Sequence, residues 1–201
     1  DMDYGPFLTH TYEITGTETP RRPEVTKEDR ERGQREGRPA ERTWPPETNF
    51  AYKGIAIQLD DATGGVARGS QFLVFEHDTM RVAGAWTGEG FIDWEGILLD
   101  GKHWRSPRSV GDLHFQNLPG PGWADPLTGT FEDTRQHARD GQAYGPFPKG
   151  WMDYRGLYKW AGQVVLSYSI GDADVLESNR ADGPGDGGPF DGTTWVRILN
   201  I

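Results

Sequence analysis

The chain has 201 residues, a formal net charge of −10 and no cysteine. The lack of cysteine excludes a disulfide framework, a thiolate nucleophile, a Cys-ligated zinc site and a covalently attached c-type haem, and no apolar run of about 18 residues is present to span a membrane. The acidic balance disfavours nucleic acid as a ligand, because phosphate binding depends on Lys and Arg. Since the chain opens at Asp1 rather than Met, we expect a removed leader or a trimmed sequence.

Aromatic side chains and turn formers stand out in the composition. The chain has 8 Trp, 7 Tyr and 9 Phe but only 34% hydrophobic residues, together with 28 Gly and 14 Pro. We therefore expect a core built from a few large aromatic side chains, each burying about 150–250 Å². Frequent Gly and Pro leave little room for long helices.

The first predicted element is a strand over residues 8–15, where polar and apolar residues alternate. A charged, Pro-rich arm over residues 17–48 follows, inserted after this strand in a single β domain that covers residues 1–201. Residues 18–47 hold eight Lys or Arg against eight Asp or Glu, a composition typical of disorder. Thr26 followed by Asp29 predicts a short capped helix within the arm. Because such a segment cannot bury much apolar surface of its own, the contacts that order it would come from the surface of the domain, from a lattice neighbour or from a partner, and we favour a partner.

Short strands separated by turns follow the arm, and residues 118–148 form a second loop-rich stretch. The pattern predicts an all-β fold, an antiparallel β-sandwich or barrel-like sheet with long irregular loops and an extended arm. The predicted strands cover residues 52–59, 70–77, 80–87, 90–99, 112–117, 156–161, 163–170, 173–177 and 193–201.

The tetrapeptide Tyr-Gly-Pro-Phe occurs twice, at residues 4–7 and 144–147, each time beside a Met-Asp-Tyr. Pro fixes its own φ near −65° and restricts the Gly before it. We predict an aromatic-clamped turn beside an outer strand in both places, with a pair of ligand-stacking aromatics as the alternative.

Metal and catalytic motifs are weak. The histidines show no HxH, HxxxH or HExxH spacing, so any convergence on a metal would have to come from the fold; they are His10, His77, His103, His114 and His137. Asp182, Asp186 and Asp191 are weak Ca²⁺ candidates on a Gly-rich loop, because Ca²⁺ prefers oxygen ligands. We predict no catalytic residues, no bound cofactor and no other metal site.

Aromatic residues near carboxylates suggest an alternative function, a carbohydrate-binding or glycoside-processing β-sandwich module. Five carboxylates lie close in sequence to Trp86 and Trp94, namely Glu76, Asp78, Glu89, Asp93 and Glu95. We expect exposed side chains at Trp86, Trp94, Trp104 and Trp123.

Several segments together resemble a known domain family. They include DMDYGPFLTHT, NFAYKGIAIQL, MRVAGAWTGEGFIDWEG, LPGPGWA and YGPFPKGWMDYRGLYKWAGQVVLSYSIGDADVLE, which cover residues 1–14 and about 49–177. The resemblance is to an uncharacterised domain of large secreted or periplasmic bacterial proteins. There it usually lies near the N-terminus, ahead of modules that often include c-type haem domains. The family has no established activity, so it implies no catalytic residues here.

This chain has no haem-attachment motif, and its arm is longer than the family's usual connection. We hypothesise a non-catalytic periplasmic or secreted accessory subunit, not an enzyme, that docks onto a photosynthetic or respiratory electron-transport complex with a c-type cytochrome. Its partners would be protein subunits of that membrane complex. The arm would contribute ion pairs and an apolar anchor. The candidate partner-binding residues are Arg21, Arg22, Arg30, Arg32, Arg35, Arg38, Trp44, Pro45 and Pro46.

Overall fold

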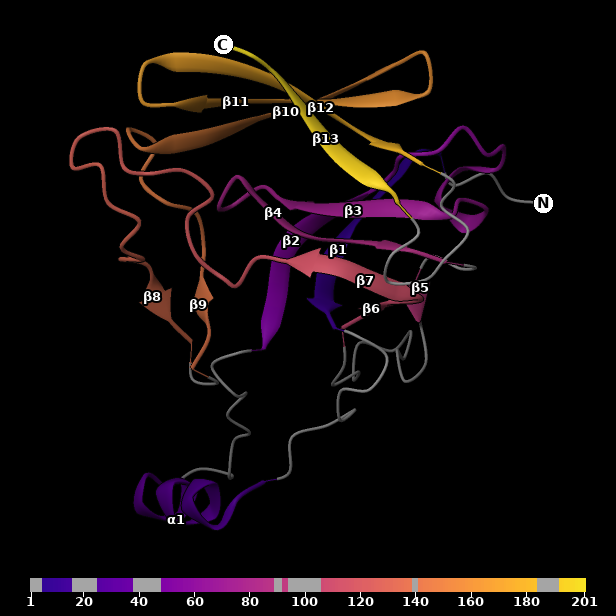
Figure 1. The fold of residues 1–201 in the computed structure, drawn as a ribbon. Helices are drawn as coiled ribbons and strands as arrows, with labels where there is room; N and C mark the ends of the chain where they lie inside the picture. The colour runs from indigo at the N-terminus through magenta and orange to yellow at the C-terminus, as the bar shows by residue number, and fades with distance from the viewer. Residues whose placement is uncertain are drawn as a thin grey trace.

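A computed structural model describes residues 5–15, 25–37, 48–88, 92–93, 106–138, 141–183 and 192–201. Strands dominate it, and two sheets lie one over the other (Figure 1). Among the described residues, no helix is both long and apolar enough to cross a membrane.

The larger sheet has seven strands in the order β5-β6-β1-β2-β3-β4-β7 and curls into a half-barrel. Neighbouring strands run antiparallel, except that β1 and β6 are parallel. The strands are β1 (Phe7–Ile14), β2 (Asn49–Gln58), β3 (Gln71–Glu76), β4 (Arg81–Thr87), β5 (Ile92–Asp93), β6 (Arg108–Ser109) and β7 (Asp112–Gln116).

The smaller sheet is an antiparallel meander in the order β10-β11-β12-β13. Its strands are β10 (Met152–Trp160), β11 (Gln163–Ile170), β12 (Ala173–Asp182) and β13 (Thr194–Asn200). Ala161 and Gly162 both have positive φ, 48° and 81°, as a two-residue hairpin turn of type I′ requires. The remaining elements are a small hairpin of β8 (Gln136–His137) and β9 (Ala143–Tyr144), the 3-10 turn η1 (Gly65–Ala67), and helix α1 (Lys27–Arg35), which lies away from the sheets (Figure 1).

The central strands β3 and β4 of the seven-stranded sheet are buried on both faces, which explains why they lack a polar face. In β3, Leu73 and Phe75 belong to the core between the two sheets, whereas Phe72 and Val74 belong to a second core. The core between the sheets also contains Ile55, Ile57, Met80, Val82, Ala85, Phe147, Trp151, Met152, Val164, Leu166, Tyr168 and Val175. The second core also contains Tyr12, Ile14, Ala51, Ala56, Val66, Ala83, Trp86 and Ile92.

Two glycines permit the tight curl of the large sheet. A Cβ atom on Gly54 would lie 2.8 Å from the ring of Tyr12, and one on Gly84 would lie 2.7 Å from the side chain of Ile14. Any larger residue at these positions would push β1 away from β2 or from β4, since close-packed cores tolerate added volume poorly.

The all-β prediction is confirmed, and most predicted strands are present with ends shifted by a few residues. The short strands β6, β8 and β9 were not predicted, and β12 continues to Asp182 rather than ending at residue 177. Of the strand expected over residues 90–99, only Ile92–Asp93 falls within the described residues. The predicted helix in the arm is also confirmed, with a reciprocal capping box between Thr26 and Asp29.

The chain bends at Pro6 and at Gly145, but the expected clamp by two aromatics is only half present in the second Tyr-Gly-Pro-Phe copy. Gly5 and Gly145 have φ of 71° and 83°, values that favour glycine. Phe147 is buried, whereas Tyr144 is 46% exposed, so only the residue after Pro folds back onto the core. In the first copy, Phe7 packs against the core, and Tyr4 lies outside the described residues.

Candidate functional site

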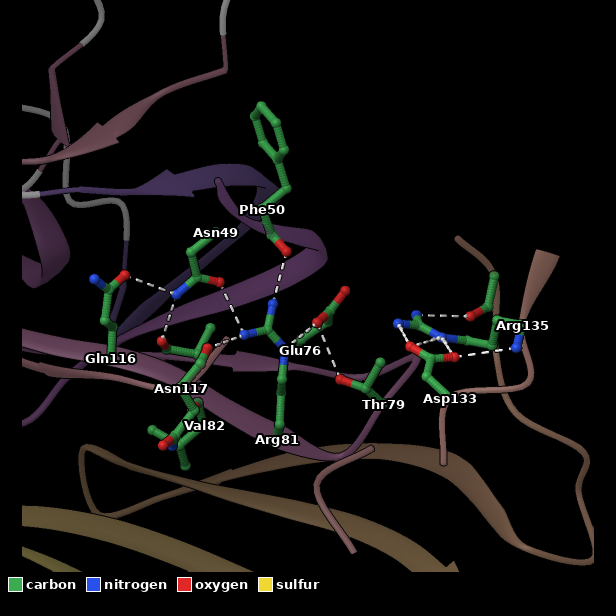
Figure 2. A network of polar contacts seen from close by, with 12 residues as sticks. Asn49, Phe50, Glu76, Thr79, Arg81, Val82, Gln116, Asn117, Asp133 and Arg135 are labelled. Atoms are coloured by element: carbon green, nitrogen blue, oxygen red, sulfur yellow. Dashed lines mark hydrogen bonds and ion pairs between the residues drawn. The ribbon is translucent and has the colours of Figure 1, made fainter. Parts of the chain in front are cut away.

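A buried polar network surrounds Arg81 on β4 (Figure 2). Its guanidinium donates to Glu76 Oε2 at 2.6 Å, to Asn49 Oδ1 at 2.9 Å and to the carbonyl oxygen of Phe50 at 2.6 Å. It also donates to the carbonyl oxygen of Asn117. Both members of the ion pair are almost fully buried, with side-chain exposures of 3% for Arg81 and 2% for Glu76.

The network ties four chain segments together, because its partners come from β2, β3, β4 and the residue after β7. Asn49 Nδ2 donates to the carbonyl oxygen of Ala83, and Asn117 Nδ2 donates to that of Val82. Burial lowers the pKa of Arg81, an effect opposed by the charge of Glu76. The buried charges of Arg81 and Glu76 pair across β3 and β4, and the other hydrogen bonds of Arg81 reach β2. The network is therefore suited to holding these strands in register.

A second ion pair, Asp133 with Arg135, lies next to the first network in Figure 2. Arg135 Nη2 donates to Asp133 Oδ2 at 2.7 Å, and the guanidinium carbon lies 4.9 Å from the ring centre of Phe147. Burial raises the pKa of Asp133, but the hydrogen bonds and charge of Arg135 outweigh it and hold the pKa below its ordinary value. This pair anchors the long loop over the second Tyr-Gly-Pro-Phe turn.

Glu177 on β12 forms the centre of a third polar cluster, between the sheets. It is fully buried and accepts from the Tyr168 hydroxyl at 2.6 Å and from Arg197 at 2.9 and 2.8 Å. Arg197 lies over the ring of Trp123 at 5.8 Å. Burial alone would lower the pKa of Arg197, but the hydrogen bonds to Glu177 and the charge of that carboxylate hold the pKa of Arg197 above its ordinary value. Burial, the charge of Glu177 and its hydrogen bond all raise the pKa of Tyr168.

The surface that faces away from the large sheet carries exposed apolar side chains. We call it the outer face and define it by Tyr158, Trp160, Leu176 and Ile198, which are 62%, 73%, 42% and 47% exposed. Side chains alternate along a strand, and their neighbours Leu157, Leu166, Val175 and Trp195 pack into the core between the sheets.

The outer face continues across all four strands. Tyr158 pairs with Val165, Val165 with Ser178 and Ser178 with Ile198, so that one row crosses the sheet. The row is flanked by exposed ion pairs, Arg155–Asp174 at 2.6 Å and Arg180–Asp182 at 3.2 Å. An apolar centre with a charged rim is the usual anatomy of a protein-binding surface.

The expectation of four exposed tryptophans is wrong for Trp86, which is fully buried and stacks on Phe72 with ring centres 5.5 Å apart. The curl of the large sheet encloses it. Trp123 is half-buried against the core, while Trp94 and Trp104 lie outside the described residues. Of the five nearby carboxylates, Glu76 is committed to Arg81 and Asp78 pairs with Lys53; Glu89 and Glu95 lie outside the described residues.

The described histidines occupy separate places. His77 stacks on Tyr154 with ring centres 4.7 Å apart, and burial lowers its pKa. His114 Nε2 lies 2.7 Å from Thr87 Oγ1, while His10 bonds its own strand and His137 lies in β8. Within the part of the chain that the structure describes, no group of three or more His, Cys, Asp or Glu residues could hold a metal ion.

The weak calcium prediction stays a prediction, since Asp186 and Asp191 lie outside the described residues. Asp182 is exposed and pairs with Arg180. Among the candidate partner-binding residues, Arg30, Arg32 and Arg35 lie on α1, where Arg32 bonds Asp29 at 2.5 Å. The other candidates lie outside the described residues, namely Arg21, Arg22, Arg38, Trp44, Pro45 and Pro46.

Sequence reasoning missed the outer face. A signal was available, because β10 and β13 carry apolar residues at successive positions, as in Leu157-Tyr158 and Ile198-Leu199. A strand with one solvated face normally alternates polar and apolar residues.

Fold and surface together define a two-sheet, predominantly antiparallel β domain with an apolar surface on its smaller sheet. Residues 73–177 match the family described as a domain of unknown function (DUF6797), and the chain belongs to that family. The match confirms the expected membership of an uncharacterised domain family. Comparison with curated proteins and with solved structures found no match in either.

Proposed function

We propose that this protein is a non-catalytic docking subunit that binds a partner protein through the outer face. The observation that carries the proposal is the exposure of Tyr158 and Trp160 beside Leu176 and Ile198 on one face of the small sheet. Tyr and Trp dominate the energy of protein interfaces, and charged residues are depleted at interface centres. The three polar clusters, by contrast, are built around buried side chains such as Arg81, Arg135 and Glu177.

As the partner we propose a periplasmic c-type-cytochrome-bearing subunit of a photosynthetic or respiratory membrane complex. This choice is supported by the resemblance to a domain that accompanies c-type haem domains. It is also supported by charge: the arm over residues 18–47 is neutral, so the net charge of −10 belongs to the rest of the chain. A strongly acidic body favours encounter with basic partner surfaces.

The test is retention of a haem-bearing polypeptide from detergent-solubilised membranes of the native bacterium by the tagged protein, followed by haem staining. The wild-type protein is expected to retain such a polypeptide. The double variant Tyr158→Ser with Trp160→Ser should bind it at least about 30-fold more weakly, because truncation of an aromatic anchor typically costs 2 kcal/mol or more.

Lys159→Ser provides the matched control, since Lys159 lies between the two aromatics and is exposed on the opposite face of the strand. It should bind like the wild type. If the wild-type protein retains no haem-bearing polypeptide, the proposed partner is wrong. If the double variant binds as well as the wild type, the outer face is not the docking surface.

A second candidate function, carbohydrate binding, now depends on different residues from those first expected. Tyr158 and Trp160 lie two residues apart on one face, a spacing of about 6.8 Å along the strand, and exposed rings at such spacing can stack on successive sugars. Titration of soluble glucans, chitooligosaccharides and xylans with Trp fluorescence tests this function. No fluorescence change with any of these sugars would reject it.

A further inference from the structure

The smaller sheet has two edges that pair with no other strand of the described structure, one on β10 and the other on β13. An unpaired edge presents backbone N–H and C=O groups on which another strand can form hydrogen bonds. Proteins usually protect such edges with bulges, charges or Pro. The two edges of this sheet differ in this protection.

The β10 edge is protected. Its register with β11 shifts between Tyr154 and Gly156, and Gly156 has φ of 138°, so the strand is irregular near its middle. Arg155 and Lys159 add charge to it. Both features oppose the addition of another strand.

The β13 edge is unprotected. Its seven residues pair with β12 without a register shift and include no Pro, Gly or Lys. Its one charged side chain, Arg197, is bound to Glu177 on the face toward the core. A regular edge of this length, whose one charged side chain is already paired, is suited to pairing with another strand.

The C-terminal half of β13 is also uncovered on both faces. Ile198 on the outer face is 47% exposed, while Leu199 and Ile201, which lie on the opposite face, are 38% and 74% exposed. Trp195, at the other end of the strand, packs on His114 and Phe115 of β7. The apolar side chains without cover are therefore concentrated at one end of the unprotected edge.

We propose that β13 pairs with β13 of a second copy of this chain, antiparallel and about a two-fold axis at Ile198, which joins the two small sheets into one of eight strands. The register follows from the faces. In a continuous sheet, outer residues must pair with outer residues, so the axis lies at a residue rather than between two. With the axis at Ile198, residues 195–201 of both copies pair fully, and the exposed Ile201 lies opposite Trp195.

Charge supports this register over its neighbour. An axis at Arg197 would place two arginines directly opposite one another, which is unfavourable. With the axis at Ile198, Arg197 lies opposite Leu199, and no charged pair crosses the seam. Each chain has a net charge of −10, but the outer residues Val196, Ile198 and Asn200 of β13 carry no charge. No like charges therefore meet on the outer face of the joined sheet. The β13 strand of a second copy carries apolar side chains on both faces, Ile198 and Leu199, and so covers the exposed apolar side chains on both faces of the first. This inference does not depend on the proposed docking function.

The first test measures the molar mass of the protein by light scattering from micromolar to submillimolar concentration. The wild-type chain should be a dimer. Ile198→Lys should raise the dissociation constant by at least about a hundredfold, because each copy loses a buried Ile and gains a like charge at the axis. Leu176→Lys provides the matched control, as it has similar exposure on the same face one strand inward, and it should remain a dimer.

A second test uses the lack of cysteine in the chain and does not depend on the folding of a lysine variant. In Ile198→Cys, the two sulfurs meet at the axis and should form an intermolecular disulfide under mild oxidation. In Val196→Cys they are four residues out of register, about 13 Å apart, and should react much more slowly. A monomeric wild type at all concentrations, Ile198→Lys dimers as tight as the wild type, or equal disulfide rates in the two cysteine variants would each overturn the proposal.

Discussion

At the scale of single residues, Asp60 determines the shape of the loop between β2 and β3. Its Oδ1 accepts from Gln58 Nε2 at 2.8 Å and from the Ala62 N–H at 2.9 Å. Its Oδ2 accepts from the N–H groups of Ser70 at 2.6 Å and Gln71 at 2.8 Å. The residues from Ala62 to Ser70 are thus closed into a loop around one carboxylate.

Asp60→Asn should lower stability at neutral pH by about 2 kcal/mol, because an amide nitrogen would face backbone donors. Burial raises the pKa of Asp60, but the hydrogen bonds outweigh it and hold the pKa below its ordinary value. A lowered folded-state pKa contributes stability above the unfolded value, which is lost as pH falls through the folded one. The difference in the free energy of unfolding between wild type and variant, measured with urea, should therefore become smaller below about pH 4.

The exposed neighbour Asp61 provides the control, since Asp61→Asn should change stability by less than about 0.5 kcal/mol. If the difference in the free energy of unfolding between wild type and Asp60→Asn stays constant from neutral pH to below pH 3, the ionised carboxylate does not hold the loop.

At the scale of elements, the helices and strands that depend on residues close together in the sequence could be predicted, whereas those that depend on distant strands could not. Thr26 and Asp29 predicted α1 because a capping box depends on residues three apart. The hairpin of β10 and β11 followed from Ala161-Gly162. β12 was predicted too short, because its second half is polar and becomes a strand only by pairing with β13. β6 has two residues and is defined by distant partners, so no local pattern could reveal it.

The buried clusters were unpredictable for the same reason. Arg81 and Glu76 face each other across a β3–β4 hairpin, but Asn49 comes from 32 residues away. Glu177 reads in sequence as a solvated strand residue, and only the fold encloses it with Tyr168 and Arg197. The outer face was missed although its pattern was local, because apolar residues on both sides of a strand also occur in buried strands.

Arg81→Met tests whether the network holds β2, β3 and β4 together. The variant leaves the Glu76 carboxylate buried without its counter-charge, which should cost about 3–5 kcal/mol in urea unfolding. Arg180→Met is the matched control, because Arg180 and Asp182 are 53% and 55% exposed and such pairs are worth about 0–1 kcal/mol. Equal midpoints for Arg81→Met and the wild type would show that the network contributes no net stability.

At the scale of the whole molecule, the arm is an insertion into a hairpin. β1 and β2 pair antiparallel, and Ile14 pairs with Asn49, so the ends of the arm are adjacent. Removal of residues 18–47 leaves Thr15, Gly16, Thr17 and Thr48 between the paired residues, a common length for a hairpin loop. The body should therefore fold without the arm.

The shortened chain is expected to gain about 2 kcal/mol from its smaller loop-closure entropy, because the connection falls from 34 residues to four. Thermal unfolding by circular dichroism measures the effect. A melting temperature well below that of the wild type would show that the arm is part of the core structure. In the docking assay, loss of binding by this stable variant would assign partner contacts to the arm.

The parallel pair of β1 and β6 has a consequence for how the chain acquires its structure. Arg108 donates twice to Glu13 at 2.9 Å, both side chains are buried, and 95 positions separate them. A polypeptide that emerges end first, from a ribosome or through a translocation channel, exposes its first strand long before this counter-charge follows. At about 5–20 residues per second, synthesis alone imposes a delay of roughly 5–20 s. During that interval the buried carboxylate of Glu13 lacks its counter-charge, so the native sheet can close only after Arg108 has emerged.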